Sequence, residues 1–153
     1  MADEEQAERS RKVVTQWFDD IGAGNAEGAI AAVSEDLKYW TIGEPGVIAF
    51  SGWRTKSDWL ETLKWFLGKL PNGLTFNYEI MTVEDDRVAV VMDGRGTLPD
   101  GRVYHNYFHN FFRVEDGLIM EIREYMDTMH FVRTLMDDSF EFRDLREDPS
   151  ATA

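Results

Sequence analysis

The second half of the chain alternates long apolar segments with short polar turns. The apolar segments are residues 74–83, 87–98, 103–114 and 118–126, and all are rich in β-branched and aromatic residues. Asp-Asp, Pro-Asp-Gly and Asp-Gly sequences separate them, which is typical of turns between strands. Because short turns join antiparallel neighbours, the pattern predicts a four-stranded antiparallel meander.

The first half of the chain has helical periodicity instead. One apolar stripe recurs at spacings of one, three and four residues and predicts a first helix; its members are Val13, Val14, Trp17, Phe18 and Ile21. A short helix over 27–33 and a strand over 37–42 follow. Residues 43–52 are rich in glycine and predict a loop.

Two helix starts carry capping signals. Thr55-x-x-Asp58 has the form of a capping box before an apolar stripe, and Pro71-Asn72-Gly73 ends that helix. Asp127 is positioned to cap a final helix over 128–136.

Helices followed by an antiparallel meander indicate an α+β fold with the helices on one face of the sheet. Long strands twist strongly, so we expect a cone-shaped α+β barrel: a strongly curved antiparallel sheet with three to four helices on its concave side. The expected organisation is a disordered acidic lead-in at 1–8, a single domain at 9–140 and a polar tail at 141–153.

Composition narrows the classes of partner. The 153 residues carry a formal net charge of −13, which disfavours nucleic acid and anionic membranes. There is no cysteine, and no apolar stretch is long enough to span a membrane. The acidic start lacks the apolar segment of a secretory signal, so we expect a cytoplasmic protein.

Two acids interrupt the apolar strands. Asp93 lies in VAVVMDGRGTL and Glu124 lies in LIMEIREYMD. An unpaired carboxyl is costly to bury, so these positions favour a wet, acid-containing pocket inside the curved sheet. Alternatively, each acid is ion-paired or solvent-facing, with Arg95 and Arg123 as the neighbouring cations.

Alternation sorts the side chains of the third strand of the meander. If Asn110 faces inward, so do Asn106 and Phe108, and either asparagine could bind a substrate oxygen or satisfy backbone groups in a bulge. The other face then carries His105, Tyr107, His109 and Phe111. Because that face is aromatic, we expect a homodimer through it, unless a bulge reverses the sorting.

The histidines do not predict a metal site. His105 and His109 are four residues apart, which on a strand is about 13 Å. We therefore expect no metal site. We also expect no organic cofactor, since the chain has no nucleotide-binding loop.

The order of elements, together with YHNYFHNFFRVEDGLIMEIREYMDT, resembles the SnoaL-like branch of the nuclear transport factor two-like superfamily. That superfamily includes ketosteroid isomerases, limonene epoxide hydrolases and polyketide cyclases. The resemblance covers about residues 9–137 and implies the cone-shaped fold. It leaves the activity open, because one fold hosts many functions.

The catalytic positions of ketosteroid isomerases are not kept. The strand base, the helix-borne tyrosine and the protonated acid of that family fall on Thr41, Trp17 and Asn110. Isomerisation by that mechanism is therefore not expected.

Limonene epoxide hydrolases match better, through LPDGR at residues 98–102 and REYMD at residues 123–127. This resemblance assigns Asp93 and Glu124 to the two catalytic acids and Tyr39 to the water-binding tyrosine. The arginine that links the acids falls on Val91, and the water-binding asparagine falls on Thr41.

Three functions fit these observations. The first is a small cofactor-free acid–base enzyme of isomerase, cyclase or epoxide-hydrolase type, acting on an apolar cyclic molecule in the cone pocket. The others are a binding module using the same pocket and a dimerisation domain whose cavity its own aromatics fill. Catalytic candidates are Asp93, Glu124 and Tyr39; substrate-binding candidates are Asn106, Asn110, Trp17, Thr41, Phe108 and Arg95.

Overall fold

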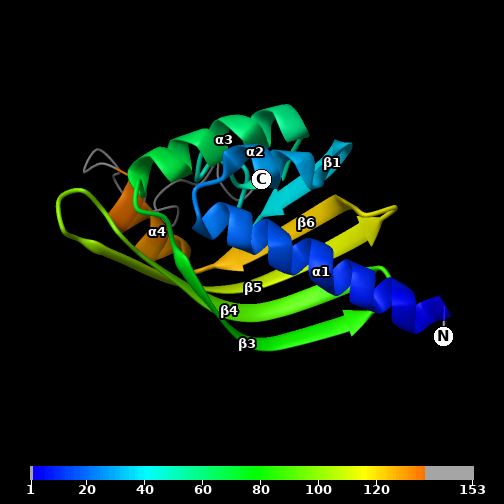
Figure 1. The fold of residues 1–153 in the computed structure, drawn as a ribbon. Coiled ribbons are helices and arrows are strands. Elements are labelled where there is room, and N and C mark those ends of the chain that lie inside the picture. Colours follow the sequence, from blue (N-terminus) through cyan, green and yellow to red (C-terminus); the bar gives the residue numbers. More distant parts are fainter. Residues whose placement is uncertain (1, 137–153) are drawn as a thin grey trace.

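A single curved sheet of six strands carries the helices on its concave side (Figure 1). The computed structural model describes residues 2–136, and the strand order is β2-β1-β6-β5-β4-β3. The strands are β1 (Val33–Thr41), β2 (Gly52–Arg54), β3 (Thr75–Glu84), β4 (Arg87–Thr97), β5 (Val103–Glu115) and β6 (Leu118–Met126); the helices are α1 (Ala2–Gly22), α2 (Ala26–Ala31), α3 (Lys56–Lys69) and α4 (Thr128–Leu135).

The predicted fold class is confirmed, and the sheet is larger than the predicted meander. β3 to β6 form the antiparallel meander. β1 starts four residues earlier than expected and pairs parallel to β6. β2 includes the end of the expected loop and pairs antiparallel to β1. The expected tail at 141–153 lies outside the described residues.

The expected disordered lead-in at 1–8 is wrong from Ala2 onward, because α1 begins there. Its exposed first turns carry ion pairs at helical spacing, from Glu5 to Arg9 and from Glu8 to Arg11 and Lys12. Ion pairs at this spacing stabilise a helix, and acidic side chains near its N-terminus interact favourably with the helix dipole.

Both predicted helix caps form. Thr55 and Asp58 make the complete capping box of α3, and the Asp127 side chain accepts a hydrogen bond from the His130 amide at the start of α4. These caps satisfy amides that the helices cannot pair internally. They fix where α3 and α4 leave the sheet.

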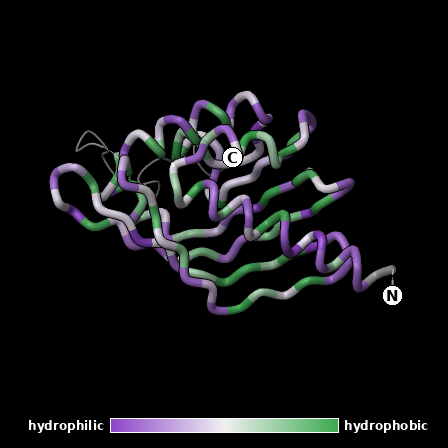
Figure 2. The backbone as a smooth tube through the Cα atoms, in the orientation of Figure 1, coloured by the Kyte–Doolittle hydropathy of each residue, from purple (hydrophilic) through white to green (hydrophobic). Residues whose placement is uncertain are grey.

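The concave face is packed by α1 and α3, which lie across the sheet (Figure 1). Trp17 and Phe18 of α1 meet Phe112 of β5 with ring centroids 5.5 and 5.4 Å apart. Strand residues alternate between this core and the outer face, and apolar and polar segments alternate along the backbone (Figure 2). The backbone at Gly96 lies so close to Gly73 that only glycine fits, since a Cβ at Gly96 would lie 2.8 Å from the Gly73 carbonyl oxygen. Among the described helices, none is long and apolar enough to cross a membrane.

The outer face of the sheet carries aromatic side chains that none of the described helices covers. Tyr107 and Trp53 are 63% and 53% exposed, and the Trp40 and Tyr125 rings lie 5.1 Å apart. Arg123 pairs with Glu121 at 2.6 Å, and its guanidinium also lies over the Trp53 ring. Charges on this face are thus partly neutralised in pairs, despite the strongly acidic chain.

We expect the protein to form a homodimer through this outer face, and Phe111→Glu to dissociate it. The substitution would place a carboxylate opposite Arg123 in this contact, and the cost of removing that charge from water would oppose association. Light scattering at tens of micromolar should give a dimer for the wild type and a monomer for the variant. Val47→Glu, at an exposed apolar residue of the loop between β1 and β2, is the matched control and should remain dimeric. A monomeric wild type would refute the prediction.

Candidate functional site

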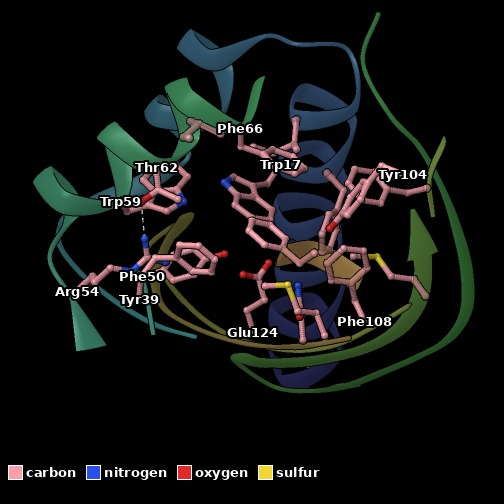
Figure 3. Close-up of a pocket in the computed structure, with 18 residues that line it drawn as sticks. Trp17, Tyr39, Phe50, Arg54, Trp59, Thr62, Phe66, Tyr104, Phe108 and Glu124 are labelled. Atoms are coloured by element: carbon pink, nitrogen blue, oxygen red, sulfur yellow. Dashed lines mark hydrogen bonds between the residues drawn. The ribbon is translucent and has the colours of Figure 1, made fainter. Parts of the chain in front are cut away.

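A cavity of about 80 Å³ lies between the concave face of the sheet and α1 and α3 (Figure 3). It has room for several water molecules. Its wall is mainly aromatic and aliphatic, with Arg54 and Glu124 as its charged side chains. The lining residues are Trp17, Phe18, Ile21, Tyr39, Phe50, Arg54, Trp59, Thr62, Leu63, Phe66, Phe76, Met92, Tyr104, Phe108, Asn110, Glu124, Met126 and Phe131.

Strand register places Glu124 at the floor of this cavity. Glu124 of β6 lies directly between Thr41 of β1 and Asn110 of β5. Alternation then turns Ile122 and Met126 inward with it, and Arg123 and Tyr125 outward. Its carboxyl points to the hydroxyl of Tyr39 from the neighbouring strand (Figure 3).

The surroundings of Glu124 favour its protonated form. Burial among apolar groups raises the pKa of this carboxyl, and the Arg54 charge and the Tyr39 hydrogen bond only partly oppose that shift. The pKa of the Tyr39 phenol is raised well above its ordinary value, first by burial and then by the Glu124 charge. Tyr39 therefore stays protonated and donates to the carboxyl, while Glu124 can exchange a proton closer to neutral pH than an exposed glutamate.

Arg54 is fixed beside this pair by neutral groups. Its Nη1 donates to Thr62 Oγ1 at 2.6 Å, and its Nη2 donates to Thr41 Oγ1 at 2.9 Å. Its guanidinium carbon lies 5.0 Å from the centre of the Tyr39 ring. Such contacts hold the cation in one place and in one orientation.

The structure separates Asp93 from Glu124, so the expected pocket with two carboxyls is wrong. Asp93 alternates with Met92, which lines the cavity, and its side chain lies on the outer face. There it accepts from Asn77 at 3.1 Å and lies 2.9 Å from His105 Nε2. The hydrogen bond from Asn77, then that from His105, lowers the pKa of Asp93, so this acid remains ionised.

Three expected substrate-binding residues do not line the cavity. Arg95 lies on the outer face, 3.1 Å from His105 Nδ1. Asn106 faces inward, but its amide is committed to the Tyr104 hydroxyl and to backbone groups of Tyr107 and Asp127. Thr41 is buried and accepts the Arg54 hydrogen bond.

The other candidates are brought together as expected. Trp17, Phe108 and Asn110 line the cavity with Tyr39 and Glu124.

No cluster of three or more histidine or acidic side chains able to hold a metal ion occurs within residues 2–136.

Arg54 is the site residue that sequence reasoning missed. It lies in a strand of three residues, directly before the capping box, so no periodic pattern marks it. Only its pairing with Tyr39 across β1 and β2 brings it into the site. For Asp93 a partial signal existed. Its row on β4 ends in the polar residues Arg95 and Thr97, although it also contains Ala89 and Val91, whereas the opposite row contains Val88, Val90 and Met92.

Known proteins resemble this chain over most of its length. PhzB, a phenazine biosynthesis protein of Pseudomonas fluorescens, is 28% identical over 102 residues, which are 63% of this chain and 60% of PhzB. The chain thus spans less than two thirds of that relative.

Two solved structures share the fold. IdmH from Streptomyces antibioticus, a proposed polyketide cyclase, superimposes with a TM-score of 0.68 at 20% identity, covering 82% of this chain and 97% of IdmH. An LEH-like epoxide hydrolase of M. tuberculosis gives 0.67 at 18% identity, covering 85% and 91%.

The family model described as SnoaL-like domain matches residues 14–122, which include α3, β3 to β5 and most of the cavity wall. This match spans well over half of the chain and agrees with the curved sheet. The chain belongs to the family of SnoaL-like domains.

Proposed function

We propose that this protein is a cofactor-free acid–base enzyme that uses the single carboxyl of Glu124 on a cyclic, largely apolar small molecule. The observation that carries the proposal is a carboxyl in an apolar cavity, hydrogen-bonded to a tyrosine and close to a fixed arginine. Burial raises the pKa of Glu124, and a proton-transfer group works best when its pKa is near the operating pH.

One carboxyl is sufficient for a proton-transfer cycle. The Glu124 carboxylate would remove a proton from a carbon next to a carbonyl group, and the resulting acid would return that proton to another atom of the substrate. Tyr39 would donate to the carboxylate and hold its orientation. Isomerisation and ring closure both fit this cycle, because the enzyme ends in its starting protonation state.

A binding module is the second candidate. The observation that favours it is the position of Asp93 on the outer face, which leaves the cavity without the second acid of the expected pair. Such a module would use the same aromatic wall and would not need Glu124 to change protonation state.

Removing the Glu124 carboxyl should abolish catalysis. A suitable probe is 5-nitrobenzisoxazole, a neutral bicyclic compound. A base removes its C3–H proton, the N–O bond breaks, and the ring opens to one coloured product, 2-cyano-4-nitrophenolate. We expect Glu124→Gln to slow this opening by about 10²–10⁴-fold, measured by absorbance. Tyr39→Phe should shift the rise of rate with pH to higher pH, because the Tyr39 hydrogen bond lowers the Glu124 pKa.

Asp93→Asn is the matched control, because it removes the outer-face acid by the same chemistry. The probe rate should stay at the wild-type value, while stability falls by at most about 1 kcal/mol through the partly exposed contact with His105. Equal rates for the wild type and Glu124→Gln would favour the binding module.

Glu124→Gln should also stabilise the protein at neutral pH. Since burial raises the folded-state pKa of Glu124, the folded state binds more protons than the unfolded state. The contribution of Glu124 to the free energy of unfolding is fully present below the unfolded-state pKa of about 4.3, and it is lost as pH rises through the folded-state pKa. Glutamine cannot ionise and therefore avoids that loss. The melting temperature of the variant should rise by about 2–4 °C for each kcal/mol of unfolding free energy regained.

Thermal melts from pH 4 to 8 test this prediction. The advantage of Glu124→Gln should be largest at the highest pH and should disappear as pH approaches about 4. A variant that melts below the wild type at neutral pH would show that Glu124 is a structural partner of Arg54.

A further inference from the structure

Arg54 contributes a positive charge to the cavity, and no carboxylate of residues 2–136 pairs with it directly. Among the described residues, no acid lies within ion-pair distance of its guanidinium. Its two bonded nitrogens are held by the hydroxyls of Thr41 and Thr62, and its faces lie near the rings of Tyr39 and Phe50. Charged groups in protein interiors are normally paired, so this arrangement leaves the cation available to a ligand.

Unpaired polar atoms gather in the same cavity. Within residues 2–136, the buried side-chain nitrogen and oxygen atoms without a protein partner are Trp17 Nε1, Arg54 Nε and Asn110 Oδ1. All three residues line this cavity. Native proteins rarely leave such atoms unpaired, and here two of the three are N–H donors that an oxygen of a ligand can accept from.

We propose that the cavity binds ring compounds with a single oxyanion, such as a carboxylate, an enolate or a phenolate, and that Arg54 receives this oxygen. The proposal rests on the proposed function in taking this cavity as the substrate site. It changes the expected ligand from a neutral apolar molecule to one whose apolar ring carries one negative charge.

The charges of the lining limit the ligand to one negative charge. Among the lining residues that the structure describes, Arg54 is the only lysine or arginine and Glu124 is the only acid. When Glu124 carries its proton, the Arg54 charge can be balanced by one anionic group of the ligand. A phosphate or a second carboxylate would find no further cation, and the chain's charge of −13 would repel it.

The aromatic wall accounts for the ring. Trp17 and Trp59 stack with their ring centroids 6.2 Å apart, and Tyr39 stacks on Trp59 at 6.0 Å. These faces bound the cavity beside Arg54 and Glu124 (Figure 3). Flat rings pack favourably against such surfaces.

Two pairs of probes with the same shape measure the contribution of the negative charge to binding. They are 2-naphthoate with 2-naphthamide, and the smaller benzoate with benzamide. Calorimetry at pH 7 should show the wild type binding the carboxylate of at least one pair about tenfold or more tightly than its amide. Arg54→Met should reduce carboxylate affinity to that of the amide and leave amide affinity unchanged. Arg95→Met, which removes an arginine from the outer face, should change neither affinity.

Further variants keep the test decisive. Arg54→Gln, which retains amide donors for Thr41 and Thr62, replaces Arg54→Met if circular dichroism shows that the methionine variant is misfolded. Equal affinities within both pairs, a preference for the amides, no saturable binding, or a carboxylate preference that survives the loss of Arg54 would overturn the proposal.

Glu124→Gln distinguishes this proposal from the proposed function. It should keep the carboxylate preference while losing the opening of 5-nitrobenzisoxazole. If that reaction is lost but the wild type shows no carboxylate preference, the acid–base function stands and the oxyanion proposal falls. If the preference is present but the reaction is insensitive to Glu124, the oxyanion site stands without the catalytic role.

Discussion

The parallel pairing of β1 with β6 is the constraint on which the candidate site depends. It places Thr41 next to Glu124, although the two residues belong to opposite halves of the chain. Antiparallel pairing of β6 with β5 places Asn110 on the other side. A shift of one residue in β6 would turn Glu124 to the outer face and Arg123 into the cavity, so register decides whether the fold has an internal acid.

The contrast between Glu124 and Asp93 shows how the two faces of one sheet give similar side chains different chemistry. The inner carboxyl is buried among rings, and burial raises its pKa. The outer carboxyl receives hydrogen bonds from Asn77 and His105, which lower its pKa. The first group is suited to exchanging a proton, whereas the second is a stable anion at neutral pH.

The junction between β2 and α3 determines where the cation lies. Arg54 pairs across the sheet with Tyr39, and the capping box of Thr55 and Asp58 begins the helix directly after it. Thr62, further along that helix, then binds the guanidinium. A short strand and a helix start together place one positive charge beside the only acid of the cavity lining.

The sequence by itself determined the fold class, most of the elements and the relative facing of residues within each strand. Period-two alternation is local, so it correctly grouped Asn106, Phe108 and Asn110 on one face of β5 and His105, Tyr107 and His109 on the other. The sequence and its family resemblance together made Trp17, Tyr39, Phe108, Asn110 and Glu124 candidates, and the structure brings these residues together.

Only the tertiary structure decided which face of one strand matches which face of the next. That choice depends on register and on the helices that cover one side, and neither is encoded in a single segment. Asp93 was therefore assigned to the pocket although it lies outside, and the parallel β1–β6 pair and the three-residue strand that carries Arg54 were not foreseen. A short strand has too few residues to show a period, so its contribution appears only when its partner is in place.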